Sequence, residues 1–167
     1  RELANFDSLT GLPNRRYFRD QFAAALERAR AAGTAVAQHL LDLGHRRLGV
    51  ISGLTSHNDR ARARIEGVRH AMRRAGLRLE PHLVCEQVFT LAGGRAGLRH
   101  LMAQDDAPTA IVCGNDLLAV GALFEAQRLG IRVPEQLSIT GIDDQELAQA
   151  CNPGLTTIRL PTQDLGR

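Results

Sequence analysis

The sequence predicts an α/β fold in which a parallel sheet carries helices on both faces, preceded by an additional N-terminal helix. From about residue 47 onward, short apolar runs alternate with longer segments of helical periodicity, which is the order of elements in a parallel sheet. The runs are apolar throughout, as expected of strands that are buried on both faces. A length of 167 residues, 44% of them hydrophobic, suits one domain of this kind.

The N-terminal region is predicted to be helical. Residues 13–32 place apolar side chains at helical spacing, at Phe18, Phe22, Ala25, Leu26 and Ala29. Gly33 is expected to end this helix, because glycine commonly follows the last helical residue. A second helix is expected over residues 34–43, ending at Gly44.

The first strand–helix unit begins with residues 47–52, a short apolar run that predicts a buried strand. Asn58 is a suitable N-cap for the next helix, and Gly76 stands where a left-handed residue would end it. The apolar stripe of that helix steps by four and three residues along Ala61, Ile65, Val68, Met72 and Ala75.

The rest of the chain repeats this alternation. Helices are predicted over residues 92–102 and 115–129, and Gly130 is expected to end the second. The apolar runs that predict strands are 83–89, 109–113, 137–141 and 155–158.

Composition excludes some classes of function. No apolar run approaches the roughly 18 residues of a membrane span, so no membrane partner is expected. The three cysteines are widely spaced and are expected to be small buried side chains, with no metal site. The formal net charge of +3 is mild, and many arginines lie along one predicted helix, at Arg60, Arg62, Arg64, Arg69, Arg73 and Arg74. Without interleaved aromatic residues, a solvated helix face is favoured over a nucleic-acid surface.

In an open parallel sheet, ligands bind beyond the carboxyl ends of the strands. Arg64, Phe89, Asn115 and Asp143 all follow predicted strands and are the candidate ligand-binding residues. A guanidinium, an amide, a carboxylate and a ring suit a neutral, hydroxyl-rich ligand. No nucleophile–base pair stands among them, so we predict binding without catalytic residues or a cofactor.

Each of these residues also has a purely structural interpretation. Asn115 is a good helix N-cap, and Asp116 after it favours the helix dipole. Asp143 could begin a turn, Phe89 could belong to the core, and Arg64 could be exposed at the border of the apolar stripe. Their shared position at one sheet edge is what favours a binding site.

Six short blocks that occur in order over about 130 residues are characteristic in combination. They are His39-Leu-Leu-Asp-Leu-Gly-His-Arg-Arg47, Arg64-Ile-Glu-Gly67, Pro108-Thr-Ala-Ile-Val-Cys-Gly-Asn-Asp116, Gly130-Ile-Arg-Val-Pro134, Ser138-Ile-Thr-Gly-Ile-Asp-Asp144 and Pro153-Gly-Leu-Thr-Thr-Ile158. Through these blocks most of the chain resembles the effector-binding C-terminal subdomain of lac repressor/GalR-type transcriptional regulators.

This resemblance implies a Rossmann-like sheet of the periplasmic-binding-protein type I and a small effector, a sugar or nucleoside, as partner. The family's effector contacts transfer to Arg64, Asn115 and Asp143, with Phe89 a weaker case. A bacterial cytoplasmic location and a homodimer are further implications. No helix-turn-helix precedes the matching region, so direct DNA binding by this chain is not expected.

Residues 1–33 resemble a different family, the GGDEF diguanylate cyclases, through Asp7-Ser-Leu-Thr-Gly-Leu-Pro-Asn-Arg-Arg16. The resemblance implies metal-binding acids shortly afterwards, but Asp42 is followed by Gly44 where a second acid belongs. Phosphoryl transfer from GTP depends on bound metal, so cyclase activity is not expected.

The sequence therefore predicts a chimera with a GGDEF-like helical segment over 1–33 and a truncated regulator subdomain over 34–167. The favoured function is non-enzymatic sensing of a small molecule. A structural scaffold without a ligand is the alternative, and an inactive cyclase remnant is a third.

Overall fold

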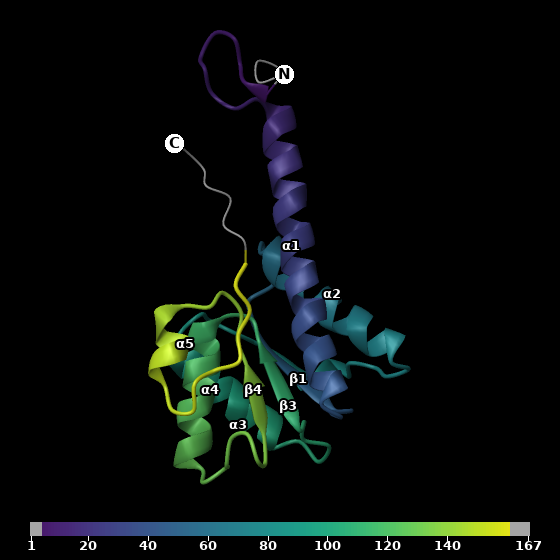
Figure 1. Cartoon of the computed structure of the whole chain (residues 1–167), viewed down its shortest axis with the longest axis vertical. Coiled ribbons are helices and arrows are strands. Elements are labelled where there is room, and N and C mark those ends of the chain that lie inside the picture. The colour runs from purple at the N-terminus through teal and green to yellow at the C-terminus, as the bar shows by residue number, and fades with distance from the viewer. Residues whose placement is uncertain (1–4, 161–167) are drawn as a thin grey trace.

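The computed structural model describes residues 5–160 and confirms the predicted α/β fold (Figure 1). Four parallel strands form one sheet in the order β2-β1-β3-β4. The strands are β1 (Leu48–Gly53), β2 (Val84–Gln87), β3 (Ala110–Cys113) and β4 (Ser138–Thr140). Ile51 of β1 is paired with Cys85 on one side and Cys113 on the other, so β1 lies inside the sheet.

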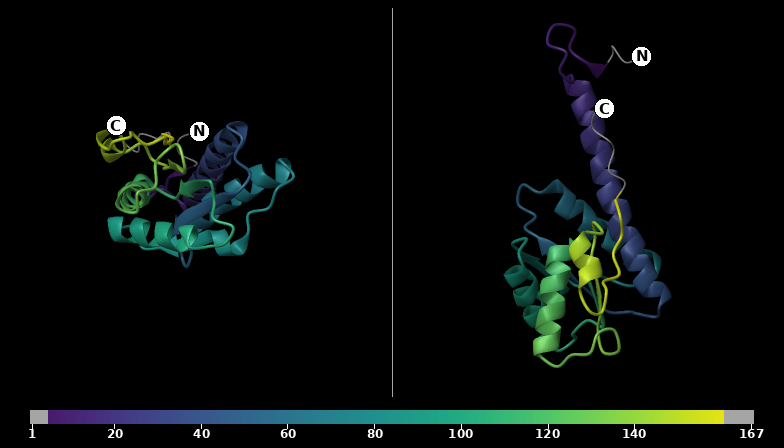
Figure 2. Two further views of the ribbon diagram at one scale, coloured as in Figure 1. Left: turned by 90° about the horizontal axis from the view of Figure 1, so that it is seen from below. Right: turned by 60° about the vertical axis from the view of Figure 1, so that its left-hand side comes forward.

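Helices cover both faces of this sheet (Figures 1 and 2). α1 (Arg15–Asp42) and α2 (Asp59–Arg74) lie on one face, and α3 (Leu91–Met102) and α4 (Asp116–Arg128) lie on the other. A short 3-10 helix, η2 (Pro81–Leu83), precedes β2, and α5 (Glu146–Ala150) follows β4. No helix within residues 5–160 is both long enough and apolar enough to cross a membrane.

Two apolar clusters form the core, one on each face. Successive strand residues point to opposite faces, so Val50 and Val112 join the cluster under α1 and α2. Ile51 and Ile111 join the cluster under α3 and α4. Burying each such side chain contributes about 1.5–3 kcal/mol to the free energy of folding. The continuous apolar runs of the sequence are thus explained by burial of β1 and β3 on both faces.

Most predicted helix ends are confirmed. The Asn58 side chain accepts from the backbone N–H of Ala61 at 3.0 Å and caps α2. Gly76 and Gly130 have φ of +73° and +72°, the left-handed geometry expected after α2 and α4. Cys85 and Cys113 are buried as predicted, whereas Cys151 is half-buried.

The predicted helix end at Gly33 is wrong, because α1 continues without a break to Asp42. Gly33 lies where α1 crosses α2, and a β-carbon at this position would overlap the carbonyl oxygen of Arg64. Gly67 of α2 is the matching residue, since a β-carbon there would overlap the carbonyl oxygen of Arg30. The Thr34 hydroxyl donates to the carbonyl of Gly67 at 3.1 Å and ties the crossing together. Gly33 therefore permits close helix packing and does not end a helix.

The predicted strand over 155–158 is also wrong. Thr156 forms an isolated parallel bridge to Thr140, and the backbone N–H groups of Gly141 and Asp143 donate to the carbonyls of Thr156 and Ile158, but no regular strand forms. Asp143 and Asp144 have positive φ, +107° and +53°, so the chain leaves regular extended geometry just after β4. The same bend places Asp143 at the carboxyl edge of the sheet.

The first part of α1 projects beyond the rest of the fold (Figure 1). The buried residues of this helix begin at Ala29 and continue toward its C-terminal end. Phe18 and Phe22, on the same apolar stripe, are 64% and 50% exposed. The α1 stripe is therefore covered by the domain only over its C-terminal half.

Candidate functional site

Two of the four predicted site residues meet at the carboxyl edge of the sheet. Arg64 stands in the second turn of α2, and Asp143 stands in the bend after β4. A nitrogen of the Arg64 guanidinium lies 3.5 Å from Oδ1 of Asp143. Both side chains line an open cavity of about 440 Å³, together with Ala25, Arg28, Ala29, Arg60, Gln145 and Leu160.

Arg64 is not the exposed residue that its sequence position suggested. Only 14% of its side chain is exposed, against 31% for Asp143. Its Nε is buried and has no hydrogen-bond partner within residues 5–160. A buried donor without a partner carries a free-energy cost of about 1–3 kcal/mol, and no described residue compensates that cost at Arg64.

The electrostatics of the pair reflect this burial. Burial raises the pKa of Asp143 above its ordinary value, although the Arg64 guanidinium opposes that shift. Burial likewise lowers the pKa of Arg64, while Asp143 opposes the change and Arg60 adds to it. In both groups the attraction of the partner charge offsets only part of the effect of burial on the pKa.

Asp116, the first residue of α4, has a structural role beyond the favourable interaction with the helix dipole that its sequence position predicts. It is fully buried, and its Oδ1 accepts from the Thr157 hydroxyl at 2.6 Å. Its Oδ2 accepts from the backbone N–H of Gln145 at 2.6 Å. These bonds fix the segment that carries Asp143. One sequence signal for this role is the Asn115-Asp116 pair directly after a buried strand. Because Asn115 caps the helix, the Asp116 carboxylate is not needed as the cap and can accept hydrogen bonds from another loop.

Asn115 is the N-cap of α4, as its structural interpretation predicted. Its side-chain oxygen accepts from the backbone N–H of Leu118 at 2.9 Å, and the residue is half-buried. It lies directly after β3 at the carboxyl edge, but it is not among the residues that line the Arg64–Asp143 cavity. A ligand contact by Asn115 stays a prediction.

Phe89 packs against the end of β1. A β-carbon at Gly53 would overlap its ring, and the ring contacts the core cluster under α3 and α4. Because Arg64 belongs to α2 on the other face, Phe89 is not brought into the cavity that Arg64 lines. Its predicted ligand contact is untested, and packing accounts for its position.

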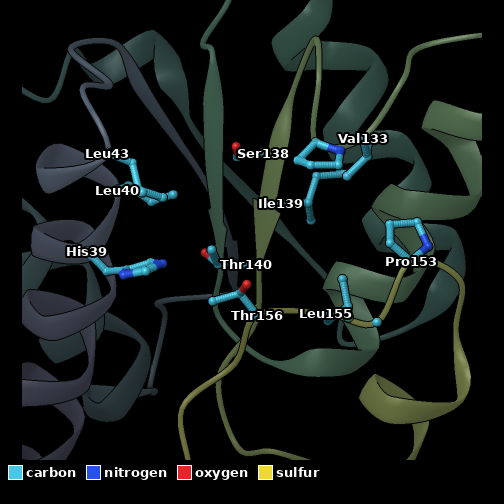
Figure 3. A pocket seen from close by; sticks show the side chains of 12 residues that line it. His39, Leu40, Leu43, Val133, Ser138, Ile139, Thr140, Pro153, Leu155 and Thr156 are labelled. Carbon is cyan, nitrogen blue, oxygen red and sulfur yellow. The ribbon is translucent and has the colours of Figure 1, made fainter.

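A second, smaller cavity of about 170 Å³ lies between the C-terminal end of α1 and the edge strand β4 (Figure 3). Leu40 of α1 and Leu43, the C-cap of that helix, approach it from one side, and Ile139 and Leu155 lie on the opposite side. Its polar groups are hydroxyls and the His39 imidazole, with no guanidinium or carboxylate. It therefore lacks the paired charges that mark the Arg64–Asp143 cavity.

A parallel sheet with a polar cavity beyond its carboxyl edge is the arrangement in which open α/β domains commonly bind ligands. Residues 37–167 match the model of the periplasmic binding protein-like domain, and the chain belongs to that family. Residues 4–46 give a short, weak match to the diguanylate cyclase GGDEF domain. The two matches overlap over residues 37–46, at the C-terminal end of α1 and in the loop after it.

The similar proteins are transcriptional regulators. The ribose operon repressor of Haemophilus influenzae is 39% identical over 142 residues, which is 85% of this chain and 42% of that protein. The repressor CytR of Escherichia coli is 38% identical over 129 residues, 77% of this chain and 38% of that protein. A LacI-family regulator from Mycobacterium smegmatis superposes with a TM-score of 0.75 at 40% identity, covering 79% of this chain and 49% of that one. The chain thus spans less than half the length of these relatives.

Proposed function

We propose that this chain is the small-molecule sensing core of a LacI/GalR-type transcriptional regulator. The observation that carries the proposal is the Arg64–Asp143 pair, which lines an open cavity at the carboxyl edge of the sheet. The similarity to repressors supports the regulatory context. The ligand is a sugar or a nucleoside, and because one relative is named for the ribose operon, ribose is the first ligand to test.

The chemistry of the pair suits such a ligand. The Asp143 carboxylate can accept hydrogen bonds from two adjacent hydroxyls, and the Arg64 guanidinium can donate to a ring or hydroxyl oxygen. Asn115 and Phe89 stand at the same sheet edge and are proposed as further contacts at its periphery. The described residues that line the cavity include no Ser, Thr, Cys or His, so a nucleophile–base pair has no place there and binding without turnover is proposed.

The regulatory setting is part of the same proposal. We place the chain in the bacterial cytoplasm, where transcriptional regulators act, with a second copy of itself as its partner. We also propose that residues 1–33 derive from a GGDEF segment and residues 34–167 from a regulator subdomain. DNA binding is not assigned to either part.

The second candidate is a scaffold without a ligand. It is favoured by the mutual pairing of Arg64 and Asp143, which partly satisfies both groups without any ligand. The third candidate, a cyclase remnant, is less well supported. Asp42 is the last residue of α1, where Gln38 donates to its carboxylate at 2.8 Å, so it does not stand on a strand beside a second acid.

Thermal denaturation in the presence of a sugar and nucleoside panel tests the proposal. We expect a saturable rise in Tm with at least one ligand, since binding to the folded state alone stabilises it. The rise should disappear in Asp143→Ala and persist in Asp20→Ala, an exposed acid of α1 that lies outside the cavity. A Tm that no compound moves would favour the scaffold.

A further inference from the structure

The cavity that holds the Arg64–Asp143 pair has an excess of positive charge. Its lining includes three guanidinium groups, from Arg28, Arg60 and Arg64, and one carboxylate, from Asp143. Over the described lining residues, the formal excess is two positive charges. Asp116, whose charge also acts on Asp143, is buried and already accepts two hydrogen bonds from Thr157 and Gln145.

Two of these arginines form no ion pair with an acid among the described residues. Within residues 5–160, neither Arg28 nor Arg60 takes part in an ion pair, whereas Arg62 and Arg69 on the same α2 helix are each paired with an acid. Arg60 stands one turn before Arg64 on the same face of α2, a spacing at which like charges repel. Burial lowers the pKa of Arg64, Asp143 opposes that shift, and the charge of Arg60 lowers the pKa further.

Arg28 reaches the cavity from a different element. It lies on α1 between Ala25 and Ala29, which line the same cavity with small side chains. The close crossing at Gly33 holds α1 against α2 only a few residues further along, so Arg28 is held beside the α2 arginines by rigid helices. The two helices therefore present donors from two sides of one opening.

We infer that the ligand of this cavity carries a phosphate ester, bound between Arg28 and Arg60, while its hydroxyls meet Asp143 and Arg64. The inference rests on the proposed sensing function and makes its ligand class narrower. A phosphate monoester carries a negative charge of about −1.5 to −2 at neutral pH and offers three acceptor oxygens. These features match the excess charge and the forked donors of guanidinium groups better than a neutral sugar does.

Isothermal titration with matched pairs of ligands tests this inference. The pairs are ribose and ribose 5-phosphate, glucose and glucose 6-phosphate, and adenosine and adenosine monophosphate. In at least one pair, the phosphorylated member should bind at least tenfold more tightly, and the difference should shrink at high salt because partly exposed charges are screened. Inorganic phosphate and gluconate, titrated separately, distinguish recognition of the ester from recognition of any anion.

The arginines are tested by removing their charge one at a time. Arg28→Gln and Arg60→Gln should each weaken binding of the phosphorylated ligand about tenfold and leave binding of its neutral partner within twofold. Both side chains lie at the surface of the cavity, so the variants should keep the wild-type Tm. Arg19→Gln on α1 and Arg73→Gln on α2 are the matched controls, since both residues lie outside this cavity.

The outcomes separate the inference from the function on which it rests. A neutral sugar that binds as well as its phosphate overturns the inference and leaves the sensing function in place. If Arg73→Gln loses as much affinity for the phosphorylated ligand as Arg28→Gln or Arg60→Gln, the attraction comes from overall charge and the inference is overturned. Gluconate binding as tightly as the phosphate ester also overturns the inference. Absence of binding by both members of every pair removes the function and the inference together.

Discussion

Gly33 of α1 lies directly against the backbone of Arg64 in α2, with no room between them for a β-carbon. The backbone of Arg64, a proposed ligand contact, is thereby in contact with the helix that begins in the GGDEF-like segment. Because the two helices touch at this point, the position of Arg64 depends on the packing of α1.

Substitution of Gly33 by alanine tests this dependence. Alanine favours a helix interior by about 1 kcal/mol relative to glycine, so an uncrowded Gly33→Ala would stabilise the protein. At this crossing we expect Gly33→Ala to lower the free energy of unfolding by about 1–3 kcal/mol, because the added methyl group overpacks the contact. Urea denaturation measures this change. Ala31→Gly, at an exposed position of the same helix, should cost about 1 kcal/mol through propensity alone. A gain in stability for Gly33→Ala would contradict the close crossing.

Asp116 should contribute strongly to the order of the segment that carries Asp143. Asp116→Ala removes the acceptor for both the Gln145 N–H and the Thr157 hydroxyl. We expect a loss of about 2–4 kcal/mol, because two hydrogen-bonding groups lose a charged partner. Thr157→Val removes one of the two bonds and should cost about half as much. Hydrogen exchange at Gln145 reports the effect locally, and unchanged protection there would argue against this role.

The two interpretations of Asn115 can be separated by a single substitution. Asn115→Asp keeps a side-chain oxygen for the Leu118 N–H, and aspartate caps helices about as well as asparagine. Stability should therefore stay within about 0.5 kcal/mol. Loss of the amide donor should lower the affinity for a bound sugar about tenfold if Asn115 contacts it. Asn115→Ala is the control, since it should cost about 1 kcal/mol through the lost cap, and an unchanged affinity in Asn115→Asp would reject the contact.

Acid stability should depend on Glu125, a fully buried carboxylate of α4. Hydrogen bonds from Arg128 and Arg95, with a smaller contribution from Arg99, lower its pKa from 4.5 to about 2, although burial opposes the shift. An acid whose folded-state pKa is lowered stabilises the fold above its ordinary pKa and loses that contribution as pH falls through the lower value. We therefore expect Tm to fall between pH 4.5 and about 2. Glu125→Gln should reduce this fall of Tm at acid pH. Glu135→Gln, at an exposed position, should leave the fall unchanged.

Much of the fold follows from the sequence because its patterns arise from local physics. Caps such as Asn58, and left-handed glycines such as Gly76, act within a few residues and were predicted correctly. Gly33 was misinterpreted, because a glycine that ends a helix and one that admits a neighbouring helix look the same in one sequence. The segment 155–158 was assigned as a strand from its apolar content, but its pairing depends on the bend at Asp143 and Asp144.

The candidate site was predictable to the level of topology. Alternation of strands and helices places Arg64 and Asp143 at one sheet edge, and the structure brings them within 3.5 Å. Asn115 and Phe89 share that edge but lie outside the cavity, because a cap and a core contact fix their side chains first. The contributions of Arg28 and Asp116 depend on long-range packing, which no local pattern in the sequence reports.

The uninterrupted course of α1 has a mechanical consequence. From Gly33 to Arg15 the helix runs about 27 Å at 1.5 Å per residue, without a break. A tilt of about 5° at the crossing would carry its far end through roughly 2 Å over that lever length. A small adjustment around Arg64 is thus magnified at the distant tip, where the exposed Phe18 ring would travel with it.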